Sequence, residues 1–258
     1  MKVCIAQTRP VKGNVSANIT SHKKLIALAV TNGAEAIFFP ELSITGYEPK
    51  LAKDLAIHKD DERLDEFQHL SDNNGITIGI GVPTISENGI QISMIVFQPY
   101  RQRQAYSKQQ LHSDEFPYFV EGKEQLIVTI DNNKIAPAIC YESLQSAHAE
   151  KAFRLGAQIY VASVAKSQKG VDKAIMYYEE VAKKYSIPVL MANCVGVCDN
   201  FQSAGNTLIC NKEGKLLAHL DGANEGLLIF DTDTEKVFEK TKKLFELIVK
   251  FSLRKILD

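Results

Sequence analysis

Short apolar runs alternate with longer amphipathic segments in the first part of the chain. Residues 2–7 and 36–39 are apolar runs of strand length. Between them, residues 15–32 place apolar side chains at helical spacing and meet a typical helix stop at Asn32-Gly33. This stretch therefore predicts a strand, a helix and a second strand.

The following segments predict a helix and then a β-hairpin. Residues 62–73 carry large apolar side chains at helical spacing. Residues 76–82 and 90–97 are apolar runs that flank the turn-forming residues 86–89. Because the two runs are separated only by this turn, we expect them to pair with each other.

The second half of the chain repeats the alternation. It predicts strands at 125–130, 134–140, 159–162, 188–195, 206–210, 215–220 and 226–230. It predicts helices at about 144–155, 171–185 and 235–257, the last as a C-terminal tail. The two halves share an order of elements but no obvious sequence repeat.

This order favours an α/β fold with a single domain over residues 1–258. No low-complexity tract or change of composition marks a linker. The predicted hairpins are antiparallel and therefore argue against a purely parallel, doubly wound sheet. Instead, they favour two sheets packed face to face and covered by helices.

Composition and charge narrow the possible partners. Thirty basic and 31 acidic residues give a net charge of −1, so we expect neither nucleic acid nor an anionic membrane as a partner. No stretch reaches about 18 consecutive apolar residues, the length of a membrane span. The basic tail is amphipathic, and we expect it to pack on its own domain or a partner subunit rather than on a membrane surface.

The five cysteines predict a cytoplasmic protein with reduced thiols. Their number is odd, and the first residues contain no apolar stretch of signal-peptide length. Cys194 and Cys198 form a CxxxC pair, but no second Cys or His pair stands at metal-ligand spacing. We therefore expect no metal site, and no nucleotide or cofactor motif is present.

Three chemically capable residues follow apolar or extended segments at abrupt boundaries: Glu41, Lys108 and Cys140. The ends of strands are where α/β folds place ligands and catalytic groups. Taken singly, two of them have a structural alternative, since Cys140 could be a buried small apolar residue and Glu41 a capping carboxylate. A nucleophilic cysteine often pairs with histidine, but His148 lies in the predicted helix after Cys140, where we expect it to face solvent.

The three residues stand in motifs that occur in a fixed order. The motifs are FPELSITGY at 39–47, YSKQQL at 106–111 and AICYE at 138–142. Together they resemble those of the nitrilase, or carbon–nitrogen hydrolase, superfamily, over nearly the whole chain. Further similarities lie at Gln7, Asn18, 33–34, 192–196 and 201–207.

The resemblance implies a Glu–Lys–Cys triad at Glu41, Lys108 and Cys140. Glu41 would take the thiol proton and Cys140 would attack the amide carbon. Lys108 and the backbone N–H of Tyr141 would hold the oxyanion. A second glutamate of the family matches Glu115, seven residues before a glycine in the sequence.

Several positions depart from the family pattern. Asp114 and Glu121 are rivals of Glu115 for the second glutamate. Glu142 stands where Asp is commoner, and Ser93 stands where Asn is frequent. The family's substrate-binding loops match this chain near Tyr47, Tyr141, Ser163 and Val164, which we take as candidate substrate contacts.

The resemblance implies a four-layer α-β-β-α sandwich. It also implies a homodimer, or a higher homo-oligomer, in which two sandwiches pair through the helices at 144–155 and 171–185. It implies hydrolysis of a small linear amide or an N-carbamoyl amine, through a cysteine thioester and without a cofactor. Nitrile hydrolysis is the alternative within the enzyme class. A catalytically silent relative that acts as a binding protein is the alternative outside it.

Overall fold

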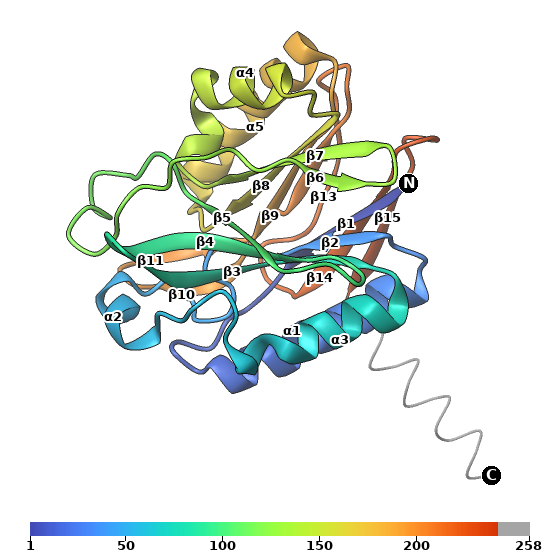
Figure 1. Ribbon diagram of the computed structural model, residues 1–258. Coiled ribbons are helices and arrows are strands. Elements are labelled where there is room, and N and C mark those ends of the chain that lie inside the picture. Colours follow the sequence, from blue (N-terminus) through green and yellow to red (C-terminus); the bar gives the residue numbers. More distant parts are fainter. Residues whose placement is uncertain (242–258) are drawn as a thin grey trace.

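The computed structural model describes residues 1–241, which form two β-sheets between two pairs of helices (Figure 1). One sheet has the strand order β15-β14-β1-β2-β3-β4-β5. Its strands are β1 (Lys2–Gln7), β2 (Ala36–Phe38), β3 (Thr77–Ser86), β4 (Gly89–Phe97), β5 (Gln104–Ser107), β14 (Gly226–Asp231) and β15 (Val237–Thr241).

The second sheet has the order β13-β12-β9-β8-β7-β6. Its strands are β6 (Val128–Ile130), β7 (Asn133–Ile139), β8 (Ile159–Val164), β9 (Val189–Asn193), β12 (Leu208–Cys210) and β13 (Leu216–His219). A separate antiparallel pair joins β10 (Val195–Cys198) to β11 (Phe201–Ala204).

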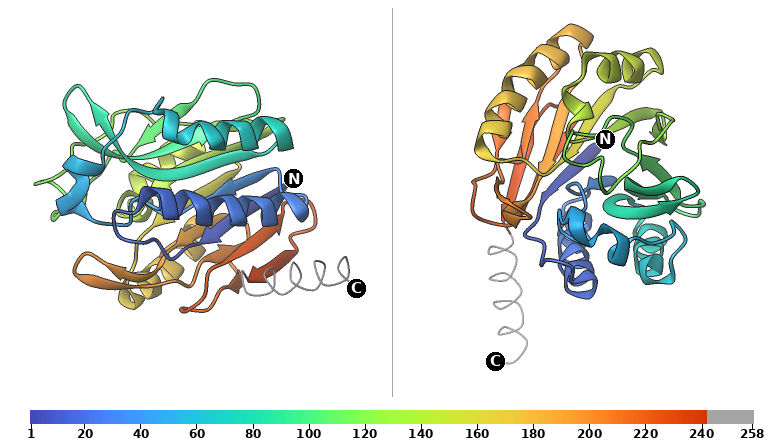
Figure 2. Two further views of the ribbon diagram at one scale, coloured as in Figure 1. Left: turned by 90° about the horizontal axis from the view of Figure 1, so that it is seen from below. Right: turned by 90° about the vertical axis from the view of Figure 1, so that its left-hand side faces the viewer.

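Helices cover the outer faces of both sheets, as the side view in Figure 2 shows. The α-helices are α1 (Val15–Thr31), α2 (Ala52–Leu55), α3 (Asp65–Asn74), α4 (Ser146–Arg154) and α5 (Gln168–Tyr185). Short 3-10 helices are η1 (Pro49–Leu51), η2 (Glu62–Leu64) and η3 (Glu142–Leu144). Helices α1 and α3 lie on the first sheet, and α4 and α5 on the second.

The core has three apolar layers, which gives the molecule the expected four-layer α-β-β-α sandwich. Alternate residues of β1 serve different layers: Val3 and Ile5 face the second sheet, while Cys4 and Ala6 face the helices. Because both faces of such a strand are buried, it appears in the sequence as a continuous apolar run.

The two sheets share a pattern of pairing. In the first, β1, β2 and β3 are parallel, with antiparallel neighbours β14 and β4 on either side. In the second, β7, β8 and β9 are parallel, with antiparallel neighbours β6 and β12. This agrees with the similar order of elements in the two halves of the sequence.

The prediction of a tail helix over 235–257 is wrong where the structure describes it. Residues Val237–Thr241 form strand β15, which pairs antiparallel with β14 from Phe230 to Gly226. The open edge of β14 offers backbone hydrogen bonds that outweigh the local helical pattern. The remainder of the predicted helix, 242–258, lies outside the described residues.

The prediction that His148 faces solvent is also wrong. Its side chain is buried, with Nε2 2.7 Å from the hydroxyl of Tyr106 and Nδ1 2.7 Å from that of Tyr160. Two buried hydroxyl groups thus satisfy both ring nitrogens, and burial lowers the pKa of His148 to about 4.

Over residues 1–241, no helix has the length and apolar character to cross a membrane.

Candidate active site

Glu41 stands on a tight turn at the end of β2 that is pressed against strand β3. The turn requires a close approach: a Cβ at Gly81 would lie 2.4 Å from both the carbonyl oxygen of Pro40 and the backbone nitrogen of Leu42. Only glycine therefore fits at this position of β3 without moving the turn. The carboxylate that the turn carries is almost fully buried, at 2% exposure.

Helix α1 holds the same turn from the other side. The side-chain amide of Asn18 donates to the carbonyl oxygen of Ile44 at 2.9 Å. His22 Nε2 lies 2.9 Å from Ser43 Oγ, and its ring stacks on Phe39 with centroids 4.0 Å apart. Burial lowers the pKa of His22 to about 4, so this ring is neutral near pH 7.

Lys108 follows β5 directly, and its side chain is fully buried. Its backbone nitrogen donates to Ile92 at 2.8 Å, and its carbonyl oxygen accepts from the nitrogen of Gly122 at 2.7 Å. A Cβ at Gly122 would lie 2.2 Å from the carbonyl oxygen of Ser107, so this glycine too permits a close approach. The backbone on both sides of Lys108 is therefore fixed.

The Lys108 ammonium bridges two buried carboxylates. Nζ lies 2.8 Å from Glu41 Oε1 and 2.6 Å from Glu115 Oε1. Glu115 also accepts from the hydroxyl of Tyr47 at 2.9 Å and from the backbone nitrogen of His112 at 2.7 Å. Of the three candidates for the second glutamate, Glu115 alone is buried in this cluster, whereas Asp114 and Glu121 are exposed.

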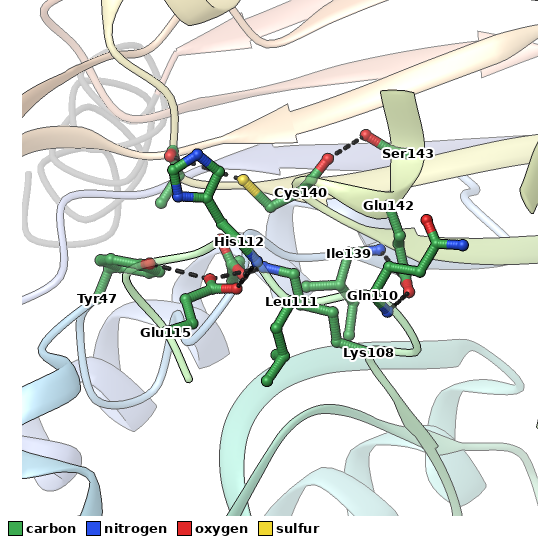
Figure 3. Close-up of polar contacts among 12 residues, drawn as sticks. Tyr47, Lys108, Gln110, Leu111, His112, Glu115, Ile139, Cys140, Glu142 and Ser143 are labelled. Atoms are coloured by element: carbon green, nitrogen blue, oxygen red, sulfur yellow. Dashed lines mark hydrogen bonds and ion pairs between the residues drawn. The ribbon is translucent and has the colours of Figure 1, made fainter. Parts of the chain in front are cut away.

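Cys140 follows β7 directly and adopts a left-handed backbone conformation with φ of +49°. Its nitrogen donates to the carbonyl oxygen of Ser163 at 3.0 Å, and its carbonyl oxygen accepts from Ser143 Oγ at 2.6 Å. Figure 3 shows its sulfur on the same side of the site as the side chains of Tyr47 and Glu115. The structure thus brings Glu41, Lys108, Glu115 and Cys140 together.

Glu142 links the lysine segment to the cysteine turn. Its Oε1 accepts from the backbone nitrogen of Ile139 at 2.7 Å and from the Tyr106 hydroxyl at 2.5 Å. Its Oε2 accepts from the backbone nitrogen of Gln109 at 2.5 Å. Burial raises the pKa of Glu142 to about 7. The residue that departs from the family's aspartate therefore serves as a buried cross-link in this chain.

The electrostatics of the cluster keep the Cys140 thiol protonated beside the carboxylate of Glu41, which can accept its proton. Burial, together with the charge of Glu41, raises the pKa of Cys140 to about 11. Burial also raises the pKa of Glu41, against the opposing effect of Lys108. Burial alone would lower the pKa of Lys108, but the neighbouring anions outweigh it and keep the ammonium charged.

Glu41 keeps one oxygen available for proton transfer. Its Oε1 is paired with Lys108, whereas the buried Oε2 has no hydrogen-bond partner within residues 1–241. An unsatisfied buried carboxylate oxygen is costly and is a common feature of catalytic groups. The Cys140 thiol is close enough to influence the pKa of this carboxylate.

A cavity of about 320 Å³ opens over Cys140. Aromatic, polar and charged side chains line it, namely Tyr47, His112, Asp114, Glu115, Tyr141, Leu144, Ala165, Lys166, Ser167, Gly170, Lys173 and Phe201. This volume suits a small molecule. Within the described part of the chain, no cluster of His, Cys, Asp and Glu is arranged to hold a metal ion.

Two of the four predicted substrate contacts line this cavity, and two do not. Tyr47 and Tyr141 are on its wall. Ser163 and Val164 are fully buried inside β8, and Ser163 instead holds the backbone of Cys140. Strand β8 ends at Val164, and the chain reaches the cavity wall only after this strand, at Ala165 and Lys166.

Lys166 is the main residue of the site that the sequence analysis missed. It lies two positions after β8, and its Nζ is 3.9 Å from Cys140 Sγ. Its place just after a buried strand is the same signal that pointed to Glu41 and Cys140. The family motifs did not include it, and it was therefore overlooked.

Comparison with known proteins assigns the fold and the family. The sequence model of the family described as carbon-nitrogen hydrolase matches residues 2–240. Among solved structures, the chain is similar to the NitN amidase from Nesterenkonia sp. AN1, with a TM-score of 0.82 and 19% identity over 90% of this chain and 92% of that one. At this identity the likeness establishes the fold.

Curated relatives are longer than this chain. It is 24% identical over 246 residues to the glutamine-dependent NAD(+) synthetase of Thermotoga maritima, and 26% identical over 250 residues to that of Acinetobacter baylyi. These alignments cover 92% and 91% of this chain but only 42% and 44% of the relatives. The chain therefore spans less than half the length of these proteins.

Proposed function

This chain belongs to the carbon-nitrogen hydrolase family, and we propose that it hydrolyses a small linear amide or N-carbamoyl amine through a cysteine thioester. One observation carries the proposal. A buried Glu41–Lys108–Glu115 cluster, held by contacts of 2.8 and 2.6 Å, lies beside Cys140 at a cavity of small-molecule size.

In the first step, the thiol proton passes to Glu41 while Cys140 Sγ forms a bond to the amide carbon. Lys108 and the backbone N–H of Tyr141 hold the negative charge that develops on the carbonyl oxygen. When the tetrahedral intermediate collapses, the C–N bond breaks, and Glu41 returns its proton to the departing nitrogen. Ammonia or an amine leaves, and a thioester remains on Cys140.

In the second step, water attacks the thioester carbon as Glu41 removes a proton from the water. The C–S bond breaks, the sulfur regains a proton, and the carboxylic or carbamic acid leaves. Glu115 positions the Lys108 ammonium, since its Oε1 lies 2.6 Å from Nζ. The hydroxyl of Tyr47 in turn fixes this carboxylate.

Among substrates, we propose primary amides first. Butyramide is bound in a structure of the Nesterenkonia amidase, and glutamine is named for the curated relatives. Both molecules carry an unbranched carbon chain that ends in a primary amide, a shape that suits the cavity. N-carbamoyl amines present the same terminal NH₂ group and form the second class.

A substrate panel scored by ammonia release tests this proposal. The panel contains butyramide, glutamine, an N-carbamoyl amine and an aliphatic nitrile, each assayed with the wild type and Cys140→Ala. We expect release from an amide or carbamoyl amine by the wild type alone. Release that persists in the purified variant would exclude Cys140 as the nucleophile. Activity on the nitrile alone would favour the alternative reaction.

Thiol labelling separates an enzyme from a silent binding protein. Iodoacetamide should alkylate Cys140 well ahead of the other cysteines, because Cys4, Cys194, Cys198 and Cys210 are buried while Cys140 borders the cavity. Peptide mapping identifies the labelled residue. Uniformly slow labelling together with no turnover on the panel would favour the binding role.

We further propose a cytoplasmic homodimer. The five cysteines are free thiols, as in a reducing compartment. Helices α4 and α5 present large apolar side chains to the outside, with Phe153 43% and Met176 69% exposed. The ring of Phe153 stacks on Tyr185 with centroids 5.0 Å apart, so the two helices contact each other through these rings. A second copy of this surface is the partner that the family resemblance implies.

A further inference from the structure

We propose that Lys166 is a second cation at the nucleophile and that it stabilises the thiolate of Cys140 during acylation. The inference deepens the proposed function and rests on it for the role of Cys140. Lys166 Nζ lies 3.9 Å from Cys140 Sγ, and the residue is only 7% exposed. It comes from the second sheet, whereas Lys108 comes from the first.

The charge of Lys166 is not committed to a carboxylate. Within residues 1–241 it forms no ion pair, and its ammonium has the Cys140 sulfur as its hydrogen-bond partner. Lys108, in contrast, is shared between Glu41 and Glu115. A buried ammonium without a carboxylate partner is costly unless a negative charge forms beside it. The thiolate of Cys140 is such a charge.

The backbone of Lys166 is held in place by buried polar groups. Its nitrogen donates to Asn193 Oδ1 at 2.9 Å, and its carbonyl oxygen accepts from Asn193 Nδ2 and from Ser203 Oγ, each at 3.1 Å. The backbone nitrogen of Ala204 also donates to this carbonyl at 2.9 Å. Asn193 is the last residue of β9 and Ser203 lies in β11, so these contacts fix the point from which the lysine side chain extends.

Helix α5 leaves room for the stem of this side chain. Gly170 lies in the first turn of the helix, where glycine is less favourable than alanine. A Cβ at this position would lie 3.3 Å from Lys166 Cβ and 3.5 Å from Cγ. Glycine therefore allows the lysine to pass between the helix and the cavity without being displaced.

The proton balance explains why a second cation is useful. The cluster of Glu41, Glu115 and Lys108 carries one excess negative charge, which disfavours a thiolate beside it. The thiol also faces the carbonyl oxygen of Ala165 at 3.9 Å, a contact that favours the protonated form. When the proton moves from Cys140 to Glu41, Lys166 balances the new charge on sulfur.

The charged groups around the thiol shift the pKa of Cys140 in opposite directions. Glu41 and Glu115 raise the pKa of Cys140, while Lys166 and Lys108 lower it. Tyr47 and Tyr178 are neutral, because burial raises the pKa of both far above their usual range. His112, Asp114 and Lys173 also border the cavity. Lys173 thus offers a matched control, a second lysine that lines the cavity but does not contact the sulfur.

The test is the rate of alkylation by iodoacetamide as a function of pH, followed by intact mass. It compares the wild type with Lys166→Met, Lys166→Arg and Lys173→Met, and uses Cys140→Ala for the background from other thiols. We expect Lys166→Met to raise the apparent pKa of alkylation by about one unit or more, which slows labelling about tenfold at neutral pH. Lys166→Arg should restore most of the rate, and Lys173→Met should follow the wild type.

Urea unfolding distinguishes loss of charge from loss of structure. Lys166→Met should be at least as stable as the wild type at pH 7.5, because it no longer buries an ammonium. A pH profile that coincides with the wild type, or slow labelling in a variant that is less stable than the wild type, would overturn the proposal. An unchanged profile with a raised KM for anionic substrates would instead assign Lys166 to substrate binding. Alkylation requires no amide turnover. The test of Lys166 can therefore be read even if the substrate panel shows no activity.

Discussion

At the scale of single residues, the site depends on groups held in conditions they would avoid elsewhere. Cys140 has a positive φ of +49°, which costs a non-glycine residue about 1–3 kcal/mol. Glu41, Lys108 and Glu115 are charged groups withdrawn from water, and the Lys108 ammonium is paired with both carboxylates. Neighbouring hydrogen bonds maintain these states, and single substitutions can therefore test them one at a time.

The backbone strain at Cys140 predicts an unusual order of stability between two inactive variants. Cys140→Gly should be more stable than Cys140→Ala by about 1 kcal/mol, because glycine adopts a positive φ without a steric penalty. At ordinary positions glycine is the less stable of the two. Urea unfolding of both variants measures the difference, and the usual order would show that the turn is not strained.

The two glutamates should differ in their effect on acylation. Glu41→Gln keeps the shape of the side chain but cannot accept the thiol proton, so no acyl-enzyme should form in a single turnover. Glu115→Gln leaves the base intact and should slow acylation without abolishing it. General-base participation contributes about 10²–10⁴ in rate, so intact mass spectrometry can resolve the contrast. The reverse pattern would exchange the two roles.

The neutral state of His22 predicts a dependence of stability on pH. Its pKa is about 4 in the folded protein and about 6.5 in the unfolded chain. Between pH 6.5 and 4 the unfolded chain therefore binds a proton at His22 that the folded protein does not bind. The contribution of His22 to the free energy of unfolding is fully present above the unfolded pKa and is lost as the pH falls toward the folded pKa. Between pH 7.5 and 5 this loss amounts to about 2 kcal/mol.

His22→Gln provides the comparison for that prediction. The variant lacks the titrating group and should be less stable than the wild type at pH 7.5. The difference between the two should narrow by about 2 kcal/mol at pH 5, measured by urea unfolding. A difference that stays constant over this range would mean that His22 is not held neutral.

At the scale of elements, strand ends and glycines place the candidate catalytic groups. Glu41, Lys108 and Cys140 each follow the end of a strand, and Lys166 follows shortly after another. Gly81 and Gly122 let the segments around Glu41 and Lys108 approach neighbouring backbone closely. The positions of the reactive atoms are therefore set by backbone packing between elements as well as by the side chains themselves.

The close contact at Gly81 predicts a loss of activity from an added methyl group. In Gly81→Ala the Cβ would lie 2.4 Å from the turn that carries Glu41. We expect a cost of about 1–3 kcal/mol in stability. A shift of the base should also lower kcat by as much as about 10²-fold.

Gly75→Ala is the matched control for this variant. Gly75 ends α3 with a φ of +64°, and a Cβ there meets nothing within 4 Å. Its substitution should cost about 1–2 kcal/mol from backbone strain while leaving kcat unchanged. If both variants lost activity in proportion to their stability, the contact at Gly81 would have no specific role at the site.

At the scale of the whole molecule, the two outer layers of helices differ in the large apolar side chains that they expose. Helices α1 and α3 bury their apolar side chains on the first sheet. Helices α4 and α5 do the same on the second sheet but also expose Phe153 and Met176. This second, outward-facing surface is the one we propose for pairing with another copy of the chain.

The proposed dimer predicts the effect of a single charge. Met176→Glu places a carboxylate in the apolar surface and should convert the dimer to a monomer, as measured by light scattering. Val197→Glu makes the same kind of change at a residue of similar exposure, 74% against 69%, on strand β10, and should leave the dimer intact. A wild type that is monomeric would refute the proposal directly.

The sequence by itself determined most of the order of the elements, and the family. Residues 3–6, 36–39 and 159–162 are apolar throughout because both faces of these strands are buried, and local composition records that burial. The three motifs identified Glu41, Lys108 and Cys140 because each is a short stretch of chain at a strand end. Such features depend on neighbours in the sequence and can be recognised from it.

Only the tertiary structure decided which distant residues meet. It paired Glu115 with Lys108, buried His148 between two tyrosines, brought Lys166 to the sulfur of Cys140, and made residues 237–241 an edge strand beside β14. Ser163 and Val164 do not line the cavity, because the length of β8, set by its pairing with β7 and β9, determines where the cavity begins. These outcomes depend on contacts between segments far apart in the chain, whose free energies no local pattern encodes.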